Sequence, residues 1–254
     1  MKYLKTLHEF LGAALNKSKE QQTAFAQKVS NKIYGDNKFN VKYLGEGGQG
    51  TSFDIGNKVL KLTKDKNETG NAIKSMKHNF KHIIKYYSVY KIKVPDTVQD
   101  QILNKFYVLT MDKIKTFEKG HIIQKLLNSF ACPDDSGNIN YKLANFGMTQ
   151  YKGKKTSGEW NFEKFKEINT LEKVCKRKGL NPDEVKGFHE QLIAMMKESM
   201  ENNILLVDMD YGNVGMQGNT LVVFDMGGMG ACPEKKSILK ELKIITLEDE
   251  NLFE

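Results

Sequence analysis

The chain has 254 residues, 39% of them apolar and 28% charged, which suits one large or two-lobed folded unit and argues against extensive disorder. A net charge of +8 suggests a polyanionic partner, but Arg177 is the only arginine among 39 basic residues. Arginine is the side chain that reads phosphates and base edges through paired hydrogen bonds. We therefore expect no specific nucleic-acid partner.

Neither a membrane nor an oxidising compartment is indicated. Apolar runs such as 204–207 and 221–224 are far too short to cross a bilayer, and charged residues within the first nine positions interrupt any signal-peptide core. The three cysteines are widely spaced and predict neither a disulfide framework nor a zinc site: Cys132, Cys175 and Cys232. We expect a cytoplasmic protein; the sequence does not indicate its oligomeric state.

Residues 1–39 predict an N-terminal helical extension. Leu4, Leu7 and Leu11 recur at helical spacing, and the pattern becomes polar before it ends near Gly35.

Residues 40–114 predict a β-rich part of the chain. Short β-prone runs are separated by turn residues, and Gly56-Asn57 stands between two of them as a hairpin turn. Residues 66–78 predict one short helix after the third run, and a further strand is expected at 106–110.

Residues 115–254 predict a mostly helical part with loops at 132–138 and 151–160. Asn181 is followed by proline and two acidic residues, the pattern of a helix N-terminus. After this helix, two β-prone runs flank Gly218-Asn219 and predict a second tight hairpin.

Gly45, Gly47 and Gly50 form a GxGxxG pattern that both dinucleotide-binding and kinase folds use. A dinucleotide site requires a helix directly after the glycines, whereas here a β-prone run and a hairpin turn follow. No Walker-type GK[ST] follows either. The pattern therefore predicts a glycine-rich hairpin that covers phosphates.

Lys61 lies in the β-prone run after that hairpin. Its apolar neighbours Leu60 and Leu62 point to the other face of a strand. A solvated strand face is the ordinary interpretation of such a lysine. Beside a phosphate-covering hairpin, however, a cation is needed, held by a carboxylate from the next helix, for which Glu68 is the candidate.

Asp208, Asn213 and Asp225 form the third pattern, with Asp225 twelve residues after Asn213. Asp208 can orient or deprotonate an attacking hydroxyl, while Asn213 and Asp225 offer oxygen ligands for Mg²⁺. A hairpin around Gly218-Asn219 would return Asp225 to the neighbourhood of Asn213. The alternative is that these side chains only cap turns.

Together these motifs resemble the protein-kinase-like superfamily over residues 40–230: a glycine-rich loop, the third-strand Lys61, a D-x-x-x-x-N loop from Asp208, and Asp225-Met226-Gly227 in place of DFG. The resemblance implies a two-lobed α+β fold, with a β-rich N-lobe and a reduced helical C-lobe, that binds ATP and Mg²⁺. It also implies that Met111 is the gatekeeper, and that backbone groups of Asp112 and Ile114 meet adenine.

The chain departs from typical protein kinases in several places. Leu206 and Val207 replace the usual His-Arg, and Asp210 stands where serine/threonine kinases place a lysine. A glycine directly before Asn213, here Gly212, is closer to the catalytic loops of small-molecule and atypical kinases. The residues after Gly227 are too few for the usual C-lobe helices. In this respect the chain resembles compact kinase-like proteins that phages encode. A protein of that kind would act in the cytoplasm of the host.

The leading hypothesis is an ATP- and Mg²⁺-dependent phosphotransferase that acts on Ser or Thr hydroxyls of a protein substrate. One alternative is a small-molecule kinase of the aminoglycoside or choline type. Another is a nucleotide-binding pseudokinase that acts as an interaction protein.

Overall fold

The computed structural model describes residues 18–47, 49–94, 107–133, 139–140, 162–202, 204, 209–226 and 242–248. The chain divides into two compact units. Unit 1 comprises residues 1–65, 86–113 and 236–254, and unit 2 comprises residues 66–85 and 114–235. The expected leucine pattern before residue 18, the loop at 151–160 and Asp208 lie outside the described residues.

A six-stranded sheet forms the body of unit 1, in the order β1-β2-β3-β5-β4-β11. Neighbouring strands are antiparallel except for the β4–β11 pair. The strands are β1 (Lys42–Gly47), β2 (Gly50–Asp54), β3 (Lys58–Thr63), β4 (Tyr86–Lys93), β5 (Tyr107–Asp112) and β11 (Lys243–Thr246). The five strands expected between residues 40 and 114 are thus confirmed, with small shifts at their ends.

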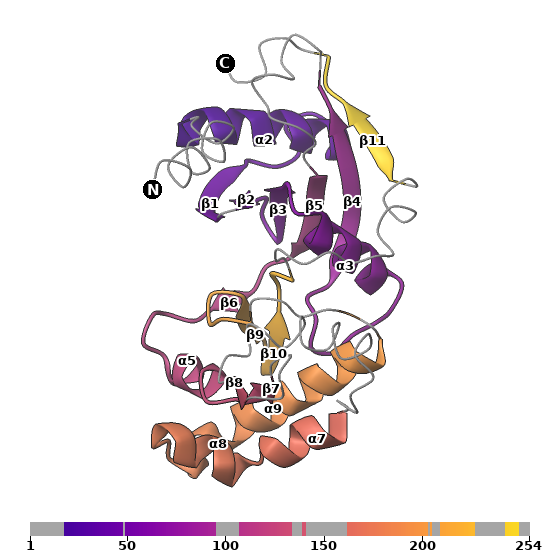
Figure 1. Cartoon of the computed structure of the whole chain (residues 1–254). Coiled ribbons are helices and arrows are strands. Elements are labelled where there is room, and N and C mark those ends of the chain that lie inside the picture. The colour runs from indigo at the N-terminus through magenta and orange to yellow at the C-terminus, as the bar shows by residue number, and fades with distance from the viewer. Residues whose placement is uncertain are drawn as a thin grey trace, which may run out of the picture. The chain divides into compact units, whose positions relative to one another are not determined.

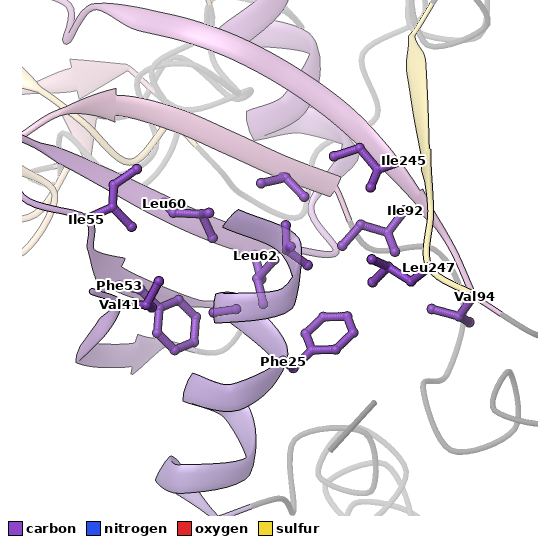
Figure 2. Packing of buried hydrophobic residues seen from close by; sticks show 13 residues of the cluster. Phe25, Val41, Phe53, Ile55, Leu60, Leu62, Ile92, Val94, Ile245 and Leu247 are labelled. Carbon is purple, nitrogen blue, oxygen red and sulfur yellow. The ribbon is translucent and has the colours of Figure 1, made fainter. Parts of the chain in front are cut away.

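Helix α2 (Lys19–Tyr34) lies along this sheet (Figure 1). Ser18 begins it with a capping box, in which its hydroxyl accepts from Gln21 N and the Gln21 side chain accepts from Ser18 N. One face of the helix, with Phe25 and Val29, is buried. Its partners in the core cluster of Figure 2 come from all parts of the sheet and include Val41, Phe53, Ile55, Leu60, Leu62, Ile92, Val94, Val108, Ile245 and Leu247. The N-terminal helix is therefore part of the core of unit 1.

Strand β11 differs from the expectation that residues 115–254 belong to the helical part. It pairs in parallel with β4, so that Ile245 lies opposite Ile92, and Leu247 N donates to Lys93 O at 2.9 Å. Ile245 and Leu247 both enter the core of unit 1. A four-residue strand that pairs with a partner 153 residues earlier leaves no local signal in the sequence.

Three helices of unit 2 pack around α9 (Pro182–Glu201), which contacts α5, α7, α8 and strand β10. Asn181 caps α9 by accepting from Asp183 N, and proline occupies its first turn, as the sequence predicts. The other helices are α3 (Lys66–Met76), α5 (Ile122–Leu127), α7 (Phe162–Ile168) and α8 (Leu171–Lys178). The short strands are β6 (Lys115–Thr116), β7 (Cys132–Pro133), β8 (Ile139–Asn140), β9 (Val214–Gln217) and β10 (Thr220–Val223).

Arg177, the only arginine, serves the interior of unit 2. Its guanidinium donates to Ser129 O at 2.9 Å, to Asn169 Oδ1 at 3.0 Å, and to Ile168 O. Asn169 in turn exchanges hydrogen bonds with both backbone groups of Ala131. Arg177 therefore joins α8 to the residues that end α5 and α7.

The expected α+β class, with one β-rich part and one mostly helical part, is confirmed. Among the described helices, none has the length and the apolar character that a membrane span requires.

The histidine of α9 predicts a pH dependence of stability. His189 is 8% exposed, stacks on Phe130 and donates from Nε2 to Asn169 O at 2.7 Å. Burial lowers the pKa of His189, outweighing the bond to Asn169 and the charge of Glu190, which favour the protonated form. The unfolded chain therefore binds a proton at His189 more readily than the folded chain does. The stability contributed by the buried neutral imidazole is present above about pH 6.5 and is lost as the pH falls.

We expect urea unfolding curves to show less loss of stability between pH 7.5 and pH 5.5 for His189→Gln than for the wild type. An identical pH dependence in the two proteins would contradict this role.

Candidate active site

The glycine-rich segment joins β1 to β2 as a hairpin. Glu46 pairs with Thr51 and Gly47 with Gly50, and a register shift at Leu44 makes Gly45 pair with Ser52. The prediction that these glycines connect two strands, and do not open a helix, is confirmed. Gln49 O accepts from Lys64 N at 2.9 Å, which holds the end of the hairpin against the chain just after β3.

Strand register places Lys61 in one row with the hairpin. Gly45 pairs with Ser52, Ser52 with Lys61, and Lys61 with Leu109 of β5. Residues directly opposite one another in a sheet project from the same face. Phe53 and Leu60 form the alternate row, which packs into the core beneath α2. Lys61 and Gly45 therefore lie on the face of the sheet that points away from α2.

The glycines of the hairpin differ in whether the surrounding structure leaves room for a side chain. A Cβ on Gly50 would lie 2.3 Å from Leu62 O, so close strand packing requires glycine there. A Cβ on Gly45 or Gly47 would meet nothing within 4 Å, and neither residue has a positive φ. Of these three glycines, packing requires only Gly50, and backbone conformation requires none. Open space above Gly45 and Gly47 suits a ligand that approaches the backbone closely.

Lys61 is only 7% exposed, so it does not belong to a solvated strand face. An ammonium group in such a place interacts more strongly with an anion than a fully hydrated one. Lys58 of the same strand lies on the other face, with its ammonium 3.9 Å from the centre of the Tyr87 ring. The two lysines of β3 therefore have separate environments.

The end of β5 contains the residues expected to meet adenine. Met111 is buried, paired with Val59 and Tyr86. The Asp112 carboxylate accepts from the Tyr87 hydroxyl at 2.6 Å, and this bond raises the pKa of Tyr87 to about 12. These contacts fix the strand end, and the adenine-binding roles of Met111, Asp112 and Ile114 stay predictions.

In unit 2 the second hairpin forms as the sequence predicts. Strands β9 and β10 pair from Val214–Val223 to Gln217–Thr220, and Gly218 in the turn has a positive φ of 60°. Beyond the last pair, Phe224 N donates to Asn213 O at 3.0 Å, and Asn213 N donates to Asp210 O at 2.9 Å. Asp225 therefore follows directly after the residue that is paired with Asn213.

Neighbouring segments fix this hairpin on both sides. On the β10 side, residues 82–84 run parallel to it, with Val223 N donating to His82 O and Ile84 N to Val223 O. The Glu198 carboxylate of α9 accepts from the backbone N–H groups of Lys81 and His82, both at 2.8 Å. On the β9 side, β6 pairs so closely that a Cβ on Gly215 would lie 2.7 Å from Lys115 O.

Asn71 is a residue that the sequence analysis missed. It lies in α3, is 4% exposed, and donates from its side-chain amide to Met226 O at 3.1 Å. It thereby anchors the backbone directly after Asp225. Asn71 and Met226 are 155 positions apart, and no local pattern in the sequence connects them.

The arrangement of several expected site residues stays a prediction. Asp208 and Gly227 lie outside the described residues. Glu68 is buried in unit 2 whereas Lys61 belongs to unit 1, so their ion pair stays a prediction. Within the described ranges, no three His, Cys, Asp or Glu side chains group to hold a metal ion. Cys175 is a buried, free cysteine.

Comparison with known proteins identifies no family. No family model matches the sequence, and no curated protein matches it. One solved structure that resembles the chain is a thermostable mutant of aminoglycoside phosphotransferase APH(4)-Ia, in a ternary complex with AMP-PNP and hygromycin B. The sequences are 11% identical, the match covers 79% of this chain and 70% of that one, and the TM-score is 0.32. Similarity at this level assigns neither a family nor an activity.

The glycine geometry gives a paired prediction. We expect Gly50→Ala to lower the free energy of unfolding by about 1–3 kcal/mol, because the strands must separate to admit the methyl group. Gly47→Ala should change it by less than about 0.5 kcal/mol, since the space there is open. Urea denaturation measures both, and equal effects of the two substitutions would contradict the packing described for β2 and β3.

Proposed function

We propose that the chain is an ATP- and Mg²⁺-dependent phosphotransferase of the protein-kinase-like type, which transfers the γ-phosphoryl group to a Ser or Thr hydroxyl of a protein. The observation that carries this proposal is the row on the sheet face opposite α2. There a buried cation, Lys61, stands in register with a hairpin whose Gly45 and Gly47 leave their backbone open.

Unit 1 would supply the binding of the phosphates. Lys61 offers positive charge, and its burial reduces the competition from water for that charge. Gly45 and Gly47 allow phosphate oxygens to approach the backbone, which a side chain would prevent. A phosphate-covering hairpin followed by a lysine-bearing strand is the arrangement that protein kinases use.

Unit 2 would supply the metal ligands and the base. Asn213 and Asp225, whose backbones lie close together beyond the last β9–β10 pair, offer the amide and carboxylate oxygens that Mg²⁺ prefers. When bound, Mg²⁺ would neutralise charge on the β- and γ-phosphates. Asn71 would keep Asp225 in position through the backbone of Met226.

In the reaction, the acceptor hydroxyl oxygen forms a bond to the γ-phosphorus and the bond to the bridging oxygen of ADP breaks. The hydroxyl proton passes to the Asp208 carboxylate, while ADP retains the electrons of the broken bond. Asp210 is exposed and accepts from Tyr211 N, a contact within its own turn.

A small-molecule hydroxyl is the second candidate acceptor. One feature of the described loop favours it: Gly212 precedes Asn213, as in small-molecule kinases. A Cβ on Gly212 would meet nothing within 4 Å, so packing does not require this glycine.

We expect Asp208→Ala to reduce phosphoryl transfer by at least about 100-fold, the scale of a lost general base, with nucleotide binding retained. Incubation with γ-labelled ATP and Mg²⁺, alone and with a cell extract, measures the transfer. Asp210→Ala is the control and should keep most of the activity. Normal turnover in Asp208→Ala, or loss only in Asp210→Ala, would contradict the assigned base.

The same assay separates the acceptors. Label that appears on proteins and disappears in Asp208→Ala supports a protein kinase. ATP consumption only with added small alcohols or aminoglycosides supports the second candidate. ATP binding that raises the melting temperature without any turnover would indicate a pseudokinase.

A further inference from the structure

One buried side chain of helix α2 hydrogen-bonds to both strands of the glycine-rich hairpin. Gln22 is 7% exposed and lies on the face of α2 that packs on the sheet. Its Nε2 donates to Glu46 Oε2 of β1 at 3.3 Å, and its Oε1 accepts from the Thr51 hydroxyl of β2 at 3.0 Å. A single amide therefore connects α2 to both strands of the hairpin.

These contacts lie at the turn end of the hairpin, next to the glycines of the proposed phosphate site. Glu46 and Thr51 are a directly opposed pair, and the next pair is Gly47–Gly50, the last before the turn. Gly45 and Gly47 point to the other face, so the amide of Gln22 holds the hairpin from behind the proposed phosphate site.

A second contact supports the same attachment. Lys19, one turn before Gln22 in α2, places its ammonium 5.3 Å from the centre of the Tyr43 ring on β1. The Tyr43 ring in turn meets Phe53 edge to face in the core. Burial, followed by the charge of Glu46 and a hydrogen bond to its carboxylate, raises the pKa of Tyr43.

We propose that Gln22 is a positioning residue for nucleotide binding: it ties the phosphate-covering hairpin to helix α2, so that the N-terminal helix sets the affinity for ATP. The proposal rests on the proposed function. Without the tie the hairpin keeps its strand pairing but loses one defined position over the phosphates, and the cost of ordering it appears in the affinity.

Helix α2 provides a matched control. Gln27 also bonds through its amide, donating to Asn31 Oδ1 and Phe39 O at 2.8 Å and accepting from Val41 N at 3.1 Å. These hydrogen bonds attach the same helix to the chain before β1, and none of them goes to the hairpin strands. Gln22→Ala and Gln27→Ala thus remove the same side chain at two places.

The first measurement is hydrogen exchange of the nucleotide-free protein. We expect faster exchange of amides in residues 46–51 for Gln22→Ala than for Gln27→Ala or the wild type. The second is ATP·Mg²⁺ binding by calorimetry. Gln22→Ala should weaken it by about three- to ten-fold, the equivalent of one hydrogen bond, and Gln27→Ala by less than about two-fold.

A rescue tests whether the contact itself matters. Gln22→Glu alone places two carboxylates together and should weaken binding, whereas combining it with Glu46→Gln restores a donor and an acceptor in exchanged positions and should return affinity to within about two-fold of the wild type. Thr51→Val, which removes only the hydroxyl bonded to Gln22, replaces Gln22→Ala if that variant does not fold.

Unchanged exchange in residues 46–51, or equal losses of affinity in Gln22→Ala and Gln27→Ala, would overturn the proposal. If the wild type does not bind ATP·Mg²⁺, the proposed function fails and with it the claim about affinity; the exchange data then still decide whether Gln22 holds the hairpin.

Discussion

The alternation of side chains along β1, β2 and β3 is the constraint on which the rest of unit 1 depends. Because successive residues of a strand point to opposite faces, the same three strands bury Phe53 and Leu60 against α2 and direct Lys61 to the other face. A slip of one residue would exchange the two sets. The packing of α2 therefore fixes both the core and the direction of Lys61. This makes the N-terminal helix a determinant of the proposed site, although none of its residues lies on that face.

Unit 2 uses the same principle in a smaller sheet. Just beyond the pairing of β9 with β10, Phe224 bonds to Asn213 O, so Asp225 follows directly after the residue that meets Asn213. Each side of the hairpin is fixed: β6 lies against Gly215, and residues 82–84, held by Glu198, lie against Val223. Asn71 then secures the backbone after Asp225. Long-range hydrogen bonds to the backbone thus support residues that are close together in the sequence.

Local signals in the sequence predicted the strands of residues 40–114, the two hairpins and the cap at Asn181, because turn glycines, β-branched runs and capping side chains act over a few residues. Strand β11, the tie at Gln22 and the anchor at Asn71 could not be predicted. Each depends on a partner at least 24 positions away, and a glutamine or asparagine gives no sign of which backbone or side chain it will meet. The sequence also could not separate Gly50, which packing requires, from Gly45 and Gly47, which it does not.

The most direct test of this account is ATP binding by calorimetry in the presence of Mg²⁺, with alanine placed at each of the two β3 lysines in turn. Lys61 lies on the face with Gly45, whereas Lys58 lies on the opposite face beside Tyr87. The account predicts that Lys61→Ala weakens binding by at least about ten-fold, a loss of about 1.4 kcal/mol or more, while Lys58→Ala stays within about two-fold of the wild type. Equal affinities of wild type and Lys61→Ala, or a larger loss in Lys58→Ala, would contradict the assignment of this face to phosphate binding.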